Sequence, residues 1–263
     1  MKVALAQFSV LSGQPELNFI KIEQYLAEAK ASGADVLFLP EMCSTGFDWS
    51  QNRSLLDSSA ALLEQVRLAA KSNAVAVSGT FLERTERGAA ANTLYYFNAK
   101  GDLLAKYRKA HLFTLFHEEK HVEAGRDIVI ADTDLGLTGF SICYDLRFPE
   151  LFRKCAIAGA EVQVLSAAFP HPRLEHWRTL IRARAIENQS FFIATNQCGY
   201  EGADEESGKI KYFGHSMVVD PWGEILLDAG EREGFYAVEV DLSMTARVRA
   251  KLTALEDRRP ELY

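Results

Sequence analysis

Residues 139–150 of this chain read Gly-Phe-Ser-Ile-Cys-Tyr-Asp-Leu-Arg-Phe-Pro-Glu. The apolar start predicts a short strand that ends at Cys143. Phe148-Pro149-Glu150 predicts the start of a helix, because proline suits the first helical turn. Backbone N–H groups point outward at such a junction and the helix dipole favours an anion, so we expect a lowered pKa for the Cys143 thiol. Cys143 is therefore a candidate nucleophile; the alternative is a buried, small apolar side chain.

The segments on either side of this stretch alternate between predicted strands and predicted helices. Apolar runs predict strands at residues 3–8, 36–39, 75–82, 94–98, 103–106, 128–133, 137–142, 163–168, 191–196, 216–219, 224–227 and 235–240. Amphipathic patterns predict helices at residues 17–31, 60–71, 149–158, 174–188 and 243–252. This order, with several hairpin turns, indicates an α/β protein with mixed strand directions, in which two stacked sheets are covered by helices. Because no repeat or linker interrupts it, we expect a single domain over residues 1–263. An acidic segment at residues 200–208 predicts a mobile loop.

Composition narrows the class of protein. The chain has 263 residues, of which 48% are hydrophobic and 25% charged, as in ordinary soluble globular proteins. A formal net charge of −7 argues against nucleic acid or an anionic membrane surface as a partner. No apolar run approaches the ~18 residues of a membrane span, and the N-terminus does not look like a signal peptide. The four scattered cysteines favour a cytoplasmic protein over a disulfide framework.

Two further polar residues follow predicted strands. Glu41 comes directly after a buried strand and Pro40, at the sheet edge where α/β proteins place their ligands. Burial there would raise the pKa of Glu41 towards that of a usable base. Lys109 follows the strand that begins at residue 103 and precedes an aromatic-rich loop. Taken singly, Glu41 also fits a surface turn or helix cap, and Lys109 a solvated side chain.

The histidines leave two other kinds of site open. A thiol nucleophile usually has a histidine base, and His111, His117 and His121 cluster in one segment, with His171 and His176 further on. His117 and His121, four residues apart, also permit a metal site. However, no helix pattern supports that spacing and the HExxH order is absent, so we expect no metal.

Three motifs resemble the nitrilase superfamily of carbon–nitrogen hydrolases, and they occur in that family's order. The matching segments are residues 39–41 (Leu-Pro-Glu), 107–113 (Tyr-Arg-Lys-Ala-His-Leu-Phe) and 142–150 (Ile-Cys-Tyr-Asp-Leu-Arg-Phe-Pro-Glu). The likeness extends over essentially the whole chain. It implies an α-β-β-α four-layer sandwich, usually dimerised as a homodimer through the outer helices. It also implies a Glu-Lys-Cys triad that works without a metal or organic cofactor.

The resemblance also assigns roles to residues. Cys143 would attack the carbon of an amide or nitrile, and Glu41 would take the thiol proton and later activate water. The Lys109 ammonium and the backbone N–H of Tyr144 would bind the developing oxyanion. A thioester would form with release of ammonia and would then be hydrolysed.

The family often adds a second glutamate after the lysine motif. Counting back from Gly125 identifies Glu118 as the match, while the neighbouring Glu119 is the alternative register. Both also fit a solvated acidic loop.

The substrate is read from two segments. Residues 175–189, together with the cysteine motif, look most like the ω-amidase branch, whose members deamidate small 2-oxo dicarboxylate monoamides such as 2-oxoglutaramate and 2-oxosuccinamate. The expected partners are thus a small amide and water. An N-carbamoyl-amine or amino-acid amidohydrolase, a deaminated-glutathione amidase, a general aliphatic amidase and a catalytically inactive binding protein on the same fold are the alternatives.

A substrate carboxylate would be bound by a positively charged side chain of the pocket. Arg147, four residues after the nucleophile, and Arg173 are the candidates, with a structural ion pair to Asp145 or Glu150 as the alternative role of Arg147. The expected pocket walls are aromatic, although aromatic residues are more often core packing: Phe113, Phe116, Tyr144, Phe169 and Trp177.

Overall fold

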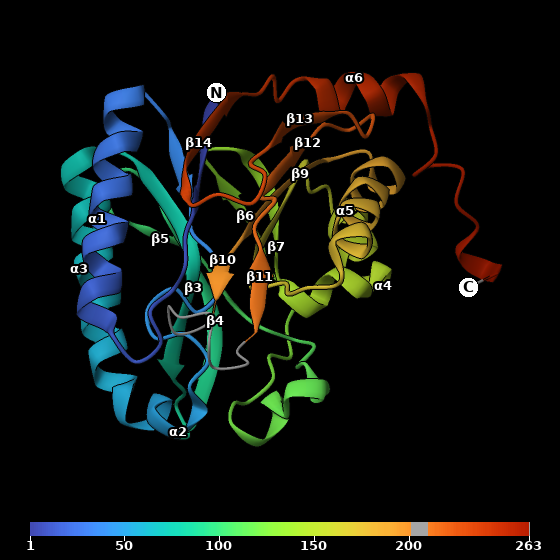
Figure 1. Ribbon diagram of the computed structural model, residues 1–263. Coiled ribbons are helices and arrows are strands. Elements are labelled where there is room, and N and C mark those ends of the chain that lie inside the picture. Colours follow the sequence, from blue (N-terminus) through green and yellow to red (C-terminus); the bar gives the residue numbers. More distant parts are fainter. Residues whose placement is uncertain (201–209, 263) are drawn as a thin grey trace.

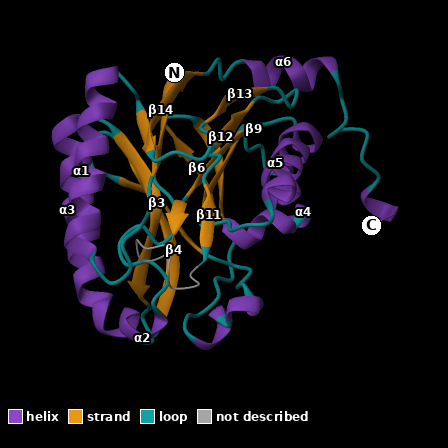
Figure 2. Ribbon diagram, in the orientation of Figure 1, coloured by secondary structure: helices purple, strands orange, loops and turns teal. Residues whose placement is uncertain are grey.

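The computed structural model describes residues 1–200 and 210–262 of the chain. Two β-sheets lie face to face at its centre, and helices cover the outer face of each sheet (Figure 1). The same view coloured by secondary structure shows the strands between helices on both sides (Figure 2). This layering confirms the α-β-β-α sandwich that the motifs imply.

Sheet A, within the described residues, has six strands in the order β14-β1-β2-β3-β4-β5. Its strands are β1 (Lys2–Gln7), β2 (Val36–Phe38), β3 (Ala76–Arg84), β4 (Ala90–Phe97), β5 (Leu103–Arg108) and β14 (Gly234–Glu239). Strands β1, β2 and β3 run parallel, and the flanking strands are antiparallel to their neighbours. The pairing of β1 with β14, from Lys2↔Glu239 to Gln7↔Gly234, joins distant parts of the chain.

Sheet B repeats this plan in the order β13-β12-β9-β8-β7-β6. Its strands are β6 (Ile130–Thr133), β7 (Gly136–Ile142), β8 (Val162–Ala167), β9 (Phe191–Asn196), β12 (Met217–Val219) and β13 (Ile225–Asp228). Here β7, β8 and β9 form the parallel centre. A separate antiparallel pair consists of β10 (Cys198–Tyr200) and β11 (Lys211–Phe213).

The long helices form the outer layers. Helices α1 (Pro15–Ser32) and α3 (Leu56–Asn73) cover sheet A, and α4 (Pro149–Ile157) and α5 (Leu174–Asn188) cover sheet B (Figure 1). The shorter helices are α2 (Trp49–Asn52), α6 (Met244–Lys251) and the 3-10 helices η1 (Arg53–Leu55), η2 (Thr114–Phe116), η3 (Glu118–Lys120), η4 (Cys143–Arg147) and η5 (Pro260–Leu262). As expected, α4 begins at its proline.

In the part of the chain that the structure describes, none of the helices combines the length and the apolar character needed to cross a membrane.

Three apolar layers hold the sandwich together. One lies between sheet A and its helices, one between the two sheets, and one between sheet B and its helices. In the middle layer, Phe38 and Tyr96 of sheet A and Phe140 and Val164 of sheet B belong to one buried cluster. Since each such side chain contributes about 1.5–3 kcal/mol on burial, this layer fixes the sheets, and so the strand ends, relative to each other.

Most predicted elements are confirmed, and the differences have local causes. Strand β4 begins at Ala90 instead of residue 94, because the polar Asn92 and Thr93 are buried with hydrogen-bond partners inside the sheet. The three-residue strands β10 and β11 carry too short a pattern to be predicted. The loop predicted at residues 200–208 falls, apart from its first residue, outside the described residues.

Candidate active site

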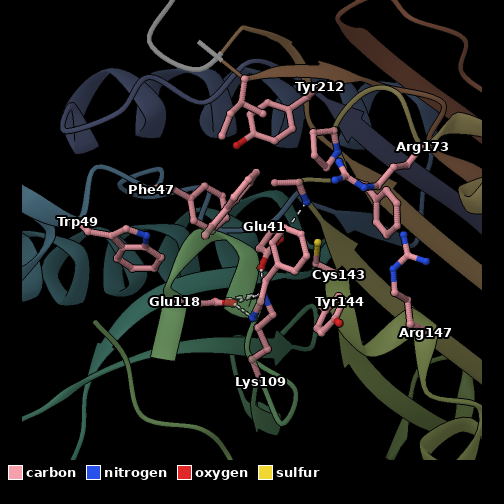
Figure 3. A pocket seen from close by; sticks show the side chains of 16 residues that line it. Glu41, Phe47, Trp49, Lys109, Glu118, Cys143, Tyr144, Arg147, Arg173 and Tyr212 are labelled. Carbon is pink, nitrogen blue, oxygen red and sulfur yellow. Dashed lines mark hydrogen bonds and ion pairs between the residues drawn. The ribbon is translucent and has the colours of Figure 1, made fainter. Parts of the chain in front are cut away.

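Strand ends from both sheets meet at one cavity. Glu41 follows β2 and Lys109 follows β5 in sheet A, whereas Cys143 follows β7 in sheet B. All three line a cavity of about 300 Å³, which is large enough for a small ligand. Figure 3 shows the Cys143 thiol facing the Glu41 carboxylate, with the Lys109 ammonium beside it. The structure therefore brings together the three residues that the sequence places after strands.

The thiol stands on a strained turn. The φ of Cys143 is +44°, in the left-handed region that residues other than glycine rarely adopt, and such strain is concentrated at functional sites. The buried Asp145 carboxylate of this turn accepts the backbone N–H of His111 at 3.0 Å and the hydroxyl of Tyr107 at 2.8 Å. Because His111 and Tyr107 flank Lys109, one carboxylate fixes the thiol and the ammonium relative to each other.

Glu41 has a partner on each carboxylate oxygen. Its Oε1 accepts hydrogen bonds from Lys109 Nζ and from Asn92 Nδ2, both at 2.8 Å, and its Oε2 accepts the backbone N–H of Ala168 at 2.9 Å. The Glu41 carboxylate also lies beside the Cys143 thiol (Figure 3), close enough to influence its pKa. These contacts hold the carboxylate against the thiol.

Lys109 lies between two carboxylates, and the second belongs to Glu118. Lys109 Nζ is 2.8 Å from Glu118 Oε2 and 3.1 Å from Glu118 Oε1. The side chains of Lys109, Glu41 and Glu118 are only 2%, 1% and 3% exposed. Glu119 is 40% exposed and lies near His117 instead. The structure thus brings Glu118 into the site and leaves Glu119 outside it.

Burial is the largest influence on the pKa values in this cluster. Burial raises the pKa of Glu41 despite the opposing effect of Lys109, as the sequence predicts. For Lys109 burial acts to lower the pKa, but Glu118 and Glu41 more than compensate and raise it well above its usual value. Lys109 therefore remains an ammonium across the neutral range.

The expected lowering of the Cys143 pKa is wrong. Burial, followed by the charge of Glu41, raises the pKa of this thiol well above its usual value. The sequence argument relied on the helix dipole, but the short η4 helix separates Cys143 from α4, and a carboxylate stands beside the sulfur. A thiol that keeps its proton needs an adjacent base, and Glu41 is in contact with it.

Replacing Glu41 by glutamine tests this electrostatic picture. Because the folded-state pKa of Glu41 lies above 4.5, its contribution to stability is complete below pH 4.5 and is lost as pH rises through the folded value. Glutamine does not titrate, so the stability of wild type relative to Glu41→Gln should fall as pH rises from 4.5, in urea unfolding at a series of pH values. For Glu119→Gln, at the exposed neighbour, the difference in stability from wild type should not change with pH. The same pH dependence in both variants would contradict the raised pKa of Glu41.

Aromatic side chains form much of the cavity wall. Four of the expected residues line it: Phe113, Phe116, Tyr144 and Phe169. Trp177 does not, which corrects the prediction: it is fully buried behind Phe169, and its indole N–H donates to the carbonyl of His215 at 2.7 Å. The sequence did not indicate six further wall residues, which lie in segments without a motif: Phe47, Trp49, Ala168, Pro170, Ile210 and Tyr212.

Both candidate arginines line the cavity on one side (Figure 3). The guanidinium of Arg147 lies over the ring of Phe169, 5.4 Å from its centre, and is 3.3 Å from His176 Nδ1. The carboxylate of Asp145 is occupied by His111 and is not the partner of Arg147. Arg147 is thus held at the cavity by an aromatic face, with its charge uncompensated by that neighbouring acid.

The histidines lie elsewhere. In residues 1–200 and 210–262, the cavity lining contains no histidine, and no group of three or more His, Cys, Asp or Glu side chains is arranged to hold a metal ion. His111 is bound to Asp145 and stacks on Phe148, while His121 stacks on Trp49. The thiol therefore has a carboxylate as its neighbour, and the Cys–His alternative finds no support in the geometry.

A cavity thiol in contact with a buried carboxylate and an adjacent ammonium, at the strand ends of an α-β-β-α sandwich, defines a cysteine-dependent hydrolase. A family model described as Carbon-nitrogen hydrolase matches residues 2–250. The chain belongs to this family of carbon–nitrogen hydrolases, in the nitrilase superfamily, and the protein is an amidase-type enzyme.

Individual relatives are similar over their whole length. The chain is 36% identical to a 2-oxoglutaramate amidase of Bacillus subtilis (strain 168), covering 99% of this chain and 98% of that one. It is 32% identical to a deaminated glutathione amidase of Dictyostelium discoideum, covering 100% and 95%. The solved structure of an amidase from Nesterenkonia sp. AN1 matches with a TM-score of 0.88 at 26% identity, covering 100% of this chain and 98% of that one. In that structure, which is of a glutamate-to-glutamine mutant, acrylamide has added to the active-site cysteine by Michael addition.

Proposed function

We propose that the protein hydrolyses a small linear amide through a thioester on Cys143. The observation that carries this proposal is the position of Glu41, which contacts both the thiol and the Lys109 ammonium at the floor of the cavity. Glu41 is the general base, Lys109 the electrostatic stabiliser and Glu118 the group that orients Lys109. We also propose that residues 1–263 form one carbon–nitrogen hydrolase domain.

The first half of the reaction follows from these contacts. Cys143 Sγ attacks the amide carbon while Glu41 takes the thiol proton, and the carbonyl oxygen becomes an oxyanion. The raised pKa of Glu41 suits a group that accepts a proton, and Lys109 is charged throughout. Lys109 and the backbone N–H of Tyr144 stabilise the oxyanion, which in a dry site lowers the barrier by about 3 kcal/mol per donor.

The second half regenerates the enzyme. The tetrahedral intermediate collapses, the C–N bond breaks, and the proton held by Glu41 passes to the nitrogen, which leaves as ammonia. Glu41 then removes a proton from water, the resulting hydroxide attacks the thioester, and the carboxylic acid leaves as Cys143 recovers its proton. Atoms and charges balance with the amide and water as the only reactants, so the proposed cycle is complete with these two substrates.

For the substrate we propose an ω-amidase specificity, towards 2-oxoglutaramate or 2-oxosuccinamate. These monoamides carry a carboxylate at the end opposite the amide. Arg147 and Arg173 line the same cavity as Cys143 and supply the matching positive charge, while aromatic walls fit the methylene chain. The similarity to a 2-oxoglutaramate amidase supports the same choice.

Ammonia release over a substrate panel tests this specificity. The panel contains 2-oxoglutaramate, deaminated glutathione, N-carbamoyl amino acids, neutral aliphatic amides and nitriles. The highest kcat/KM is expected for 2-oxoglutaramate. Deaminated glutathione is the second candidate, because a relative of similar identity bears that name. Activity confined to N-carbamoyl compounds or neutral amides would exclude the ω-amidase assignment and leave the chemistry of the site intact.

Replacing Arg147 by glutamine separates binding of the carboxylate from chemistry. A charge-assisted contact to a substrate carboxylate supplies roughly 10- to 100-fold in kcat/KM. Arg147→Gln should lose that factor on 2-oxoglutaramate, mostly through KM, and change little on a neutral amide of the same length. Arg178→Gln, which removes an arginine of α5 that is outside the cavity lining, is the control. Equal losses on charged and neutral amides would contradict this role.

We further propose a homodimer working in the cytoplasm. Ile186 on α5, Trp222 and Leu252 are exposed apolar side chains, with Ile186 beside Gly223 and Lys251 over the Trp222 ring, and a second copy would cover them. All four cysteines are free, in keeping with a reducing compartment. Light scattering of the purified protein decides between the mass of two chains and that of one.

A further inference from the structure

Asn92 contacts both carboxylates of the site and the backbone of Lys109. It lies on β4 and is completely buried. Its side-chain amide nitrogen donates to Glu41 Oε1 at 2.8 Å and makes a longer contact of 3.5 Å with Glu118 Oε1. Its backbone carbonyl accepts the N–H of Lys109 at 2.9 Å. One residue thus touches both carboxylates and the segment that carries the ammonium.

The other half of the same amide is left unsatisfied. Asn92 Oδ1 is buried and has no hydrogen-bond partner among the residues that the structure describes. An unpaired buried carbonyl costs roughly 1–3 kcal/mol, so such a group in a native protein calls for an explanation. The orientation of the amide explains this cost. The NH₂ group points at the two carboxylates, and in that orientation the carbonyl oxygen of the same amide has no donor within reach.

The charges show why neutral donors are needed at this point. Glu41 and Glu118 together carry two negative charges, Lys109 carries one positive charge, and the Cys143 thiol is uncharged in the resting state. The cluster is therefore net negative although all three charged side chains are almost fully buried. Two carboxylates that share such a site tend to retain one proton between them. A protonated Glu41 is no longer a base.

We infer that Asn92 is a positioning residue that keeps Glu41 ionised and aimed at Cys143, by presenting N–H groups to the two carboxylates that Lys109 alone does not neutralise. This inference rests on the proposed role of Glu41 as the base. It assigns to Asn92 no contact with the substrate; Asn92 acts through Glu41 and Glu118.

The expected signature is a shift in pH dependence. A hydrogen bond to a carboxylate favours its charged form, so removing the bond lets Glu41 take up a proton at higher pH. The acid limb of any reaction that uses Glu41 as base should then move to higher pH. A residue that only supported the fold would lower activity or stability without moving that limb.

The experiment measures the rate at which iodoacetamide alkylates Cys143, by peptide mapping, across a pH series. Alkylation needs no knowledge of the substrate: the sulfur attacks carbon, iodide leaves, and the thiol proton goes to the base. In Asn92→Ser the acid midpoint of this rate should rise by about one to two pH units, and the rate on the acid limb should fall roughly 10- to 100-fold.

A second variant separates hydrogen bonding from packing. Asn92→Asp keeps the shape of the side chain but adds a third carboxylate, so it should react more slowly than Asn92→Ser near neutral pH. A packing role predicts the opposite order, because aspartate fills the space and serine does not. The matched control is Asn18→Ser, which removes another fully buried amide whose nitrogen donates to the carbonyls of Leu11 and Ser44. It should lose stability with no change of midpoint.

Glu41→Gln in the same assay keeps this inference distinct from the proposed function. If Glu41→Gln alkylates with the wild-type pH profile, Glu41 is not the base and the proposed function fails together with the inference. If Glu41→Gln changes the profile while both Asn92 variants retain the wild-type midpoint, the assignment of Asn92 alone is overturned.

Discussion

A Cys143→Ala variant is expected to hydrolyse none of the panel amides, with turnover reduced by about 10⁵-fold or more. In the proposed mechanism the sulfur forms the bond that replaces the C–N bond, and among the described residues the cavity lining contains no second cysteine and no serine or threonine. The variant should remain folded, because the side chain faces the cavity and the substitution removes a single sulfur atom. It should also still bind substrate, since the arginines and the aromatic walls are untouched. Single-turnover ammonia release and calorimetric binding measure the two properties.

The matched control is Cys155→Ala. Cys155 is also a free cysteine, buried on α4 against Gly139, and it has no part in the cavity. Its replacement should reduce stability by about 1 kcal/mol and leave turnover intact. Residual turnover in Cys143→Ala within a hundredfold of wild type would show that another group attacks the amide.

The Lys109→Ala variant is expected to lose both activity and stability. Without the ammonium the oxyanion loses its charged donor, and kcat should fall about 10³-fold. Removing one partner of a buried ion pair also destabilises a protein by about 3–5 kcal/mol, because Glu41 and Glu118 are left as uncompensated buried charges. A hydrolase that used a histidine base would survive this substitution, so the result also decides between the two kinds of site.

The loss of stability in Lys109→Ala should depend on pH. Burial already raises the pKa of Glu41 against the opposing effect of Lys109, so removing Lys109 raises the folded-state pKa of Glu41 further above its unfolded value. Groups with raised folded-state pKa values contribute stability that is complete at low pH and is lost as pH rises. The variant should therefore be closest to wild type near pH 4.5 and furthest from it near neutrality, in urea unfolding.

Lys106→Ala provides the comparison for this variant. Lys106 lies on β5, the strand that Lys109 follows, but its side chain is 37% exposed and pairs with Glu83 at 2.6 Å. A partly exposed pair of this kind is worth at most about 1 kcal/mol. Activity should be unchanged. A similar pH-dependent loss in Lys106→Ala would mean that the effect is not specific to the buried cluster.

The sequence predicts the fold and three strand-end residues because both depend on local patterns. A predicted strand ends shortly before each of Glu41, Lys109 and Cys143, and strands that run in the same direction end at the same edge of a sheet. The register of the second glutamate could also be counted along the chain, and the structure places Glu118 where that count predicts. The order of strands and helices also indicates two stacked sheets, and the resemblance carried by the motifs implies the four-layer sandwich.

Features that depend on contacts between distant segments could not be read in this way. The pKa of Cys143 depends on Glu41, which reaches it from the other sheet, so the helix dipole was a poor guide. Trp177 is aromatic, as a wall residue would be, but it lies on the inner face of α5, and its side chain therefore packs in the apolar core. In the sequence Asn92 is only a polar residue early in an apolar strand, which is a weak signal. Its role can be inferred only from its contacts with the two carboxylates in the folded protein.

The pairing of β1 with β14 has a consequence for the order in which the molecule can be made. The N-terminal strand leaves the ribosome first, yet its partner in sheet A begins at Gly234. At ~5–20 residues per second, β1 waits roughly tens of seconds with one edge unpaired. Its residues Val3–Ala6 are completely buried in the finished protein, and an apolar open edge invites pairing with another chain. A nascent chain cut short before β14 would already contain every residue of the cavity, and we expect it to aggregate instead of forming a smaller working enzyme.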